Sequence, residues 1–131
     1  MSGKNSYLLD TNAVIALLQG NEKLLEILKP ARWIGISAIS QIEFLIFPDM
    51  TYQDRILFAR FLKKVSVVNL VENQTELFEH IVEIRQKYRI KLPDAIIAGT
   101  AVCKRAALVS SGRQLQKIQN LPVVNFLLSQ E

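Results

Sequence analysis

The sequence has very little cysteine and histidine. Cys103 is the one cysteine and His80 the one histidine among 131 residues. A single cysteine cannot form a disulfide within the chain, and these two residues cannot supply the Cys and His ligands of a structural zinc site. Any bound metal is therefore expected to be a hard cation held by oxygen atoms.

The sequence also lacks an apolar run long enough to cross a bilayer. Its first apolar stretch, residues 7–18, is interrupted by Asp10, and a membrane-spanning helix needs about 20 apolar residues. No small-residue cleavage site follows the stretch, so we predict a cytoplasmic protein without a membrane partner. The length of 131 residues, with 50% of them hydrophobic, predicts a single domain over residues 1–131.

Basic residues outnumber acidic ones, which gives a net charge of +4 and favours a polyanionic partner. If that partner is RNA, Lys and Arg side chains are the candidate phosphate contacts. We single out Arg113, which follows a predicted strand, and Arg89 and Lys91, which precede Asp94. The remaining candidates are Arg85, Lys87, Lys104, Arg105 and Lys117. As an alternative, the cations before Asp94 only complement the negative end of a helix dipole.

Segments typical of strands and of helices alternate along the chain. Strands are predicted at about residues 7–10, 32–36, 65–70, 107–110 and 122–125. Helices are predicted at 13–18, 21–28, from Ser37 or Ser40 to Ile46, at 52–64 and 73–88, and from Asp94 to Cys103. The last helix is expected to begin close to Asp94 because Pro93 disfavours helix at Leu92. The alternation predicts an α/β fold with a parallel sheet and right-handed crossovers.

Three carboxylates occupy similar positions relative to these elements. Asp10 closes the first strand, Glu43 lies beside the apolar stripe of the helix after the second strand, and Asp94 opens a later helix. Each of them alone is explained as a helix cap or a surface charge. Together at one end of a sheet, they would repel one another unless a cation or protons neutralised them. Since carboxylates suit Mg²⁺ or Mn²⁺, all three are candidate metal ligands.

These residues stand in short motifs that resemble those of PIN-domain ribonucleases, in particular the VapC-type toxins of bacterial type II toxin–antitoxin pairs. The motifs are LDTN at residues 9–12, IE at residues 42–43 and LPDAIIA at residues 92–98. Each motif is short, but their order and spacing make the set fairly specific. The resemblance covers essentially the whole chain.

The resemblance implies a PIN-like three-layer α/β/α fold with a central parallel sheet of four to five strands. It implies a metal-dependent endoribonuclease that hydrolyses RNA with a water activated by Mg²⁺ or Mn²⁺. Asp10, Glu43 and Asp94 would be the catalytic residues and the metal ligands, while Thr11 or Asn12 would orient the site. The implied partners are an RNA substrate, a cognate antitoxin and a second copy of the chain.

One position departs from the family's pattern. The family often carries an acidic residue or Asn after the fourth strand, two positions beyond a hydroxyl residue. Here Ser110 matches the hydroxyl position, but Gly112 has no side chain, so the fourth carboxylate is missing. Two alternatives follow: an enzyme with a weakened metal site, or an inactive PIN-like module that binds RNA or protein. A third alternative keeps the metal but acts on another substrate, as a phosphatase or a DNA nuclease.

Residues 38–62 carry more apolar side chains than one small core needs. The excess predicts either a homodimer face or a groove for a partner helix. Five phenylalanines have the spacing of packing or interface residues, which argues against a role in stacking on RNA bases. They are Phe44, Phe47, Phe58, Phe61 and Phe78.

Overall fold

The computed structural model describes residues 5–71 and 74–127. Five short strands form one sheet in the order β3-β2-β1-β4-β5, and each neighbouring pair is parallel. The strands are β1 (Ser6–Leu9), β2 (Trp33–Ser37), β3 (Ser66–Val68), β4 (Ala107–Val109) and β5 (Val123–Val124). The predicted parallel sheet of four to five strands is therefore confirmed.

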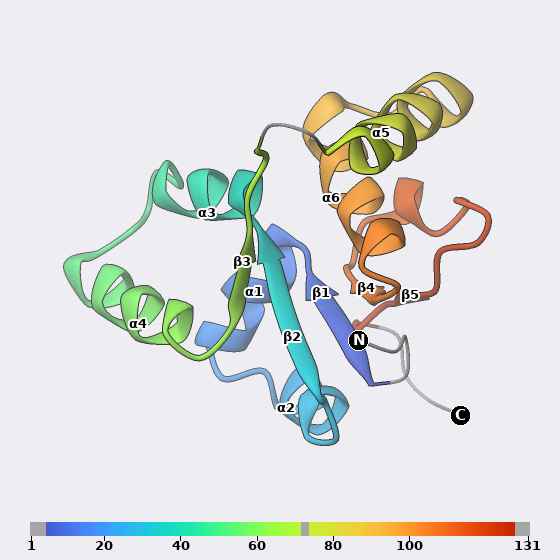
Figure 1. Cartoon of the computed structure of the whole chain (residues 1–131). Coiled ribbons are helices and arrows are strands. Elements are labelled where there is room, and N and C mark those ends of the chain that lie inside the picture. The colour runs from blue at the N-terminus through green and yellow to red at the C-terminus, as the bar shows by residue number, and fades with distance from the viewer. Residues whose placement is uncertain (1–4, 72–73, 128–131) are drawn as a thin grey trace.

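Helices cover both faces of this sheet, which gives the three layers expected from the resemblance (Figure 1). The helices are α1 (Thr11–Leu18), α2 (Glu22–Leu28), α3 (Ala38–Leu45), α4 (Tyr52–Leu62), α5 (Thr75–Tyr88) and α6 (Leu92–Cys103), and a short 3-10 helix, η1 (Arg113–Leu115), follows β4. Within the described part of the chain, no helix is long and apolar enough to span a membrane.

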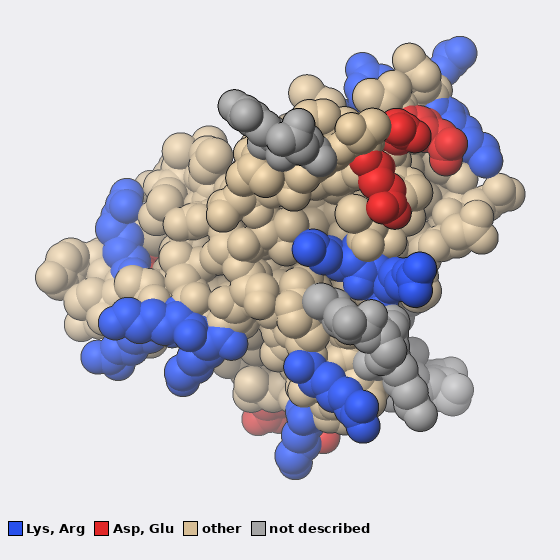
Figure 2. Space-filling view, in the orientation of Figure 1, with Lys and Arg blue, Asp and Glu red and all other residues tan. Residues whose placement is uncertain are grey.

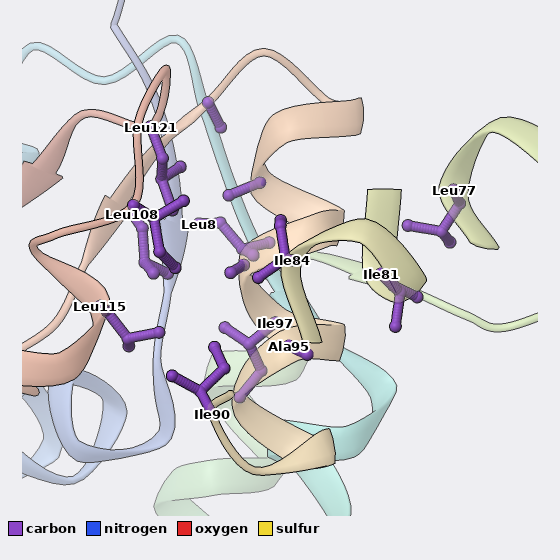
Figure 3. Close-up of a cluster of buried hydrophobic side chains, with 14 of the residues drawn as sticks. Leu8, Leu77, Ile81, Ile84, Ile90, Ala95, Ile97, Leu108, Leu115 and Leu121 are labelled. Atoms are coloured by element: carbon purple, nitrogen blue, oxygen red, sulfur yellow. The ribbon is translucent and has the colours of Figure 1, made fainter. Parts of the chain in front are cut away.

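Each strand supplies side chains to two separate apolar cores. Neighbouring residues of a strand point to opposite faces of the sheet. Leu8 and Leu108 therefore join the core under α5 and α6, whereas Leu9 and Val109 join the core under α1, α2, α3 and α4. Figure 3 shows Leu8 and Leu108 in one cluster with Ile97 of α6. Burial on both faces fixes the register of these central strands.

Helix α6 is held against α5 by a close approach of their backbones. A Cβ atom at Gly99 would lie 2.7 Å from Cγ1 and 3.1 Å from the backbone nitrogen of Ile81. Glycine allows this contact because it has no Cβ atom. The contact also fixes the position of the whole of α6, whose first turn carries Asp94.

Two helices begin earlier than the sequence predicts. The helix expected to begin close to Asp94 begins at Leu92, because Pro93 lies in the first turn, where a missing N–H leaves no helical hydrogen bond unmade. The helix expected at residue 13 begins at Thr11, because Asp10 is its N-cap. Residue 73, the predicted start of the helix before α6, lies outside the described residues.

Of the five phenylalanines with packing spacing, two do not pack in a core. Phe44 and Phe58 stack in the core under α3 and α4, with ring centroids 4.0 Å apart. Phe47 and Phe78 are exposed by 44% and 46% instead. Phe47 and Phe78 therefore do not pack in a core, and the other expectation for them, a role at an interface, stays a prediction.

Candidate active site

The sheet brings the sequence-predicted site residues to the edge at which its strands end. Asp10 directly follows β1, Glu43 lies on α3 after β2, and Ser110 directly follows β4. Helix α6 leads into the beginning of β4, so it runs against the strands and its first turn, with Asp94, lies at the same edge. In parallel sheets this is the edge where functional groups collect. We call it the carboxylate edge.

Asp10 is the most buried of the three carboxylates, with 6% of its surface exposed. Its Oδ1 accepts a hydrogen bond from the Thr11 N–H at 2.8 Å, and its Oδ2 accepts one from the Ser110 hydroxyl at 2.6 Å. The Asn12 side-chain amide donates a longer bond of 3.4 Å to Oδ2. Thr11, Asn12 and Ser110, the three predicted supporting residues, thus contact Asp10 directly.

The other two carboxylates are each held by one neighbour. The Thr11 hydroxyl donates to Glu43 Oε1 at 2.7 Å, so Thr11 joins Glu43 to Asp10 through its hydroxyl and its backbone N–H. The Gln114 side-chain amide donates to Asp94 Oδ2 at 3.2 Å. This role of Gln114 could not be predicted from the sequence, because a polar residue in a short surface turn has many possible partners.

The negative charge at this edge is not neutralised by the protein. Burial raises the pKa of the Asp10 carboxyl, hydrogen bonds from Ser110 and Thr11 oppose the rise, and the charges of Asp94 and Glu43 add to it. Among the described residues, 5–71 and 74–127, the one ion pair within 4.0 Å joins His80 to Glu76 on α5. The carboxylate edge therefore carries like charges that interact with one another and have no cationic partner.

The three carboxylates do not form a closed metal site as they stand. No three acidic, His or Cys side chains among the described residues are grouped so that they could hold one ion. The donor chemistry nevertheless fits a hard divalent cation, because each group offers carboxylate oxygen and Asp10 feels the charge of the other two. Asp10, Glu43 and Asp94 are the residues that would hold such a cation.

The space beside Gly112 is taken up by Gln114. A Cβ atom at Gly112 would lie 3.3 Å from Ser110 Oγ and 3.3 Å from Gln114 Nε2. A side chain at position 112 would thus point toward the Asp10–Ser110 contact and toward the amide that holds Asp94. A neutral amide stands next to Asp94 where the family often has a fourth carboxylate.

Five of the eight predicted phosphate contacts lie at two different edges of the sheet. Arg113 begins η1 directly after Gly112, while Arg89 and Lys91 lie in the connection that leads into α6, and all three are exposed near the carboxylate edge. Lys104 and Arg105 follow the last turn of α6 and precede β4, so they lie at the opposite edge of the sheet. That position rules out phosphate contacts by Lys104 and Arg105 at the carboxylate edge.

Comparison with known proteins identifies the class of this domain. A model of the PIN domain matches residues 7–121, so the chain belongs to the PIN domain family. A search of the curated proteins found no match.

Solved structures share the fold over nearly the whole chain. The chain is 28% identical to a chain of a toxin–antitoxin complex from Klebsiella pneumoniae, with a TM-score of 0.76 and coverage of 92% of this chain and 98% of that one. VapBC2 from Rickettsia felis bound to a promoter DNA fragment is similar at 22% identity and a TM-score of 0.75, over 91% of this chain and 97% of that one. VapBC-1 from nontypeable Haemophilus influenzae is similar at 22% identity and a TM-score of 0.73, over 92% of this chain and 97% of that one.

The raised pKa of the Asp10 carboxyl predicts that its charge lowers the stability of the folded chain. A carboxyl whose pKa is raised on folding holds its proton more tightly in the folded state than in the unfolded state. The free energy of unfolding therefore falls as the pH rises from 3.8, the usual pKa of this carboxyl, through its raised pKa in the folded chain. Asp10→Asn keeps an acceptor for the Thr11 N–H but removes the charge. Without divalent cations, the variant should melt at a higher temperature than the original chain at pH 7, and the difference should vanish below pH 3.8.

The matched control for this measurement is Asp49→Asn, which removes an exposed carboxylate on the loop between α3 and α4. Thermal melts followed by circular dichroism between about pH 3 and 8 should show little change for the control. An Asp10→Asn variant that melts below the original chain at pH 7 would show that the charge of Asp10 is stabilised by its surroundings.

Proposed function

We propose that the chain is a divalent-metal-dependent endoribonuclease and the toxin component of a toxin–antitoxin pair. The observation that carries the proposal is the buried Asp10, whose carboxyl feels the uncompensated charges of Glu43 and Asp94 at one edge of the sheet. Membership of the PIN domain family supports nuclease chemistry. The similarity to a toxin–antitoxin complex over 92% of the chain supports the biological role.

In this proposal Asp10, Glu43 and Asp94 hold Mg²⁺ or Mn²⁺. When bound, the cation neutralises charge on the scissile phosphate and favours deprotonation of the attacking water. Thr11 holds Asp10 and Glu43 at a fixed spacing through its N–H and its hydroxyl. This arrangement keeps the Asp10 carboxylate oriented while it is desolvated.

The remaining polar residues position the strand end and the RNA. Ser110 donates to Asp10, and Asn12 accepts from the Ser111 N–H at 3.2 Å, which ties the turn after β4 to the start of α1. Arg113, Arg89 and Lys91 supply exposed positive charge near the same edge, where the RNA phosphates would bind.

A second candidate function is an inactive PIN-like module that binds RNA or protein. Gly112 and Gln114 favour it, because they leave a neutral amide where a further carboxylate would strengthen the metal site. A metal site with fewer anionic ligands binds its cation more weakly. The two candidates differ in whether the carboxylates of the chain as it stands support cleavage.

Cleavage of a labelled RNA in Mg²⁺ or Mn²⁺ tests the choice between them. The ribonuclease should cleave RNA, and Asp10→Asn should lower the rate by more than about 100-fold, because outer-shell partners of a metal already cost about 10- to 100-fold. Gly112→Asp should raise the rate, since its side chain would point toward Ser110 and Gln114. The control Gly112→Asn has similar size without the charge.

Single-stranded DNA and a small phosphate ester, digested in parallel, test the third alternative. RNA should be the substrate that is cleaved. If neither the original chain nor Gly112→Asp cleaves RNA with either metal, the ribonuclease proposal is wrong. Retained RNA binding by Asp10→Asn would then favour the inactive module.

We also propose that the outer side of α3 and the loop after it bind partner proteins. Large apolar side chains are exposed there, with Ile46 at 72% and Tyr52 at 78%. A hollow of about 330 Å³ lies beside them, with Phe44, Phe47 and Met50 on its apolar wall and the acidic Asp49 and Asp54 in its lining. Such a surface fits an apolar antitoxin segment with basic flanks, and its exposed rim fits a second copy of the chain.

Sedimentation velocity of the purified chain tests the homodimer. The original chain should sediment as a dimer, and Ile46→Glu should raise its dissociation constant by more than about 10-fold, as truncation of a central interface residue does. The control Val82→Glu changes an apolar residue of α5 that is exposed by 52% and should leave the dimer intact. A monomeric original chain, or a dimer lost with Val82→Glu, would contradict the assignment.

A further inference from the structure

The edge of the sheet opposite the carboxylates is strongly basic. In a parallel sheet, the connections that lead into the strands all lie at the edge where the strands begin. The connections into β2, β3 and β4 each carry two cations, and residues 29–32, 63–65 and 104–106 contain no acidic residue. The six cations are Lys29, Arg32, Lys63, Lys64, Lys104 and Arg105. We call this surface the basic edge.

These cations are available to a ligand. Arg32, Lys64 and Arg105 are exposed, as are Lys29 and Lys63, and Lys104 is half-buried. In the described part of the chain, none of the six forms an ion pair within 4.0 Å, since the pair found there is His80 with Glu76. Figure 2 shows blue side chains over α4 and around the turn into β3, and others near the start of β2. Two acidic residues lie near these cations: Glu26 on the last turn of α2, and Glu76, which lines one hollow together with Lys104.

Helix dipoles account for only half of this charge. Lys29, Lys63 and Lys104 are the C-cap residues of α2, α4 and α6, where a cation complements the negative end of the helix. Arg32, Lys64 and Arg105 lie beyond the caps and add like charge to an already basic surface. Unpaired like charges repel one another and lower stability. We therefore expect a polyanionic ligand to neutralise the three cations beyond the caps.

We propose that the basic edge binds the phosphate backbone of a folded RNA, away from the carboxylate edge. The cations precede β3, β2 and β4, which lie along one edge with β1 between β2 and β4. Contacts of such cations with a phosphate backbone need no base recognition. The inference rests on the proposed ribonuclease function for its choice of RNA, and it adds a second contact surface for that RNA. The strands are short, with five residues in β2 at about 3.3 Å each, so one folded RNA can reach both edges.

The test measures binding of a fluorescent hairpin RNA in EDTA, where no metal-dependent cleavage occurs. Lys64→Gln with Arg105→Gln should weaken binding by about 10-fold and reduce the slope of log affinity against log salt by about 1.5, since each lost phosphate contact contributes about 0.7 to 0.9. Arg32→Gln alone should give a smaller loss in the same direction. Thermal melts check that each variant folds.

The matched control is Arg55→Glu, which lowers the net charge from +4 to +2 just as the double variant does. Arg55 lies near the beginning of α4, at the other end of the helix that leads into the basic edge. Equal losses for the control and the double variant would overturn the proposal, because net charge alone would then explain the binding. Unchanged RNA binding by the double variant would overturn it as well.

A DNA duplex of the same length is measured in parallel. If the double variant lost binding to the DNA duplex but kept its binding to the hairpin RNA, the assignment to RNA would be overturned. Because the assay contains no divalent cation, it is independent of the cleavage experiment. If the original chain never cleaves RNA but the double variant loses hairpin binding, the ribonuclease proposal is wrong and the proposal of RNA binding at the basic edge stands.

Discussion

Burial of the Asp10 carboxylate at the end of a strand is the constraint on which the site depends, and repulsion from two further carboxylates adds to it. The parallel sheet places the residues that follow β1, β2 and β4 at one edge, and the contact of Gly99 with Ile81 fixes the helix that brings Asp94 there. Asp10 is then desolvated beside two other negative charges. Thr11 and Ser110 hold Asp10 in this unfavourable position through short hydrogen bonds.

The carboxylate edge holds three carboxylates with exposed cations near them, whereas the basic edge holds six cations. Helices α1 and α6 begin at the carboxylate edge, where their positive ends favour Asp10 and Asp94, while α2, α4 and α6 end at the basic edge. The helix dipoles thus account for part of the charge at each edge. The dipoles do not account for Glu43 and the burial of Asp10 at one edge, or for the cations beyond the caps at the other. These features are the part that we assign to ligands.

Much of the fold could be predicted because its signals are local. The alternation of strand and helix patterns predicts the parallel sheet, and the apolar run before Asp10 marks Asp10 as the end of a strand. The start of α6 was predicted two residues late, because the bias against helix before Pro93 is only a preference. The roles of Gln114 and of the basic edge could not be predicted, since both depend on which connections the topology brings together.

Calorimetric titration with Mn²⁺ shows whether the carboxylate edge holds a divalent cation. The chain should bind Mn²⁺, and Asp94→Asn should weaken binding by at least about 10-fold. The control Glu83→Gln, on the exposed side of α5, should bind as the original chain does. Absence of Mn²⁺ binding by the original chain, or equal binding by Asp94→Asn, would contradict the account.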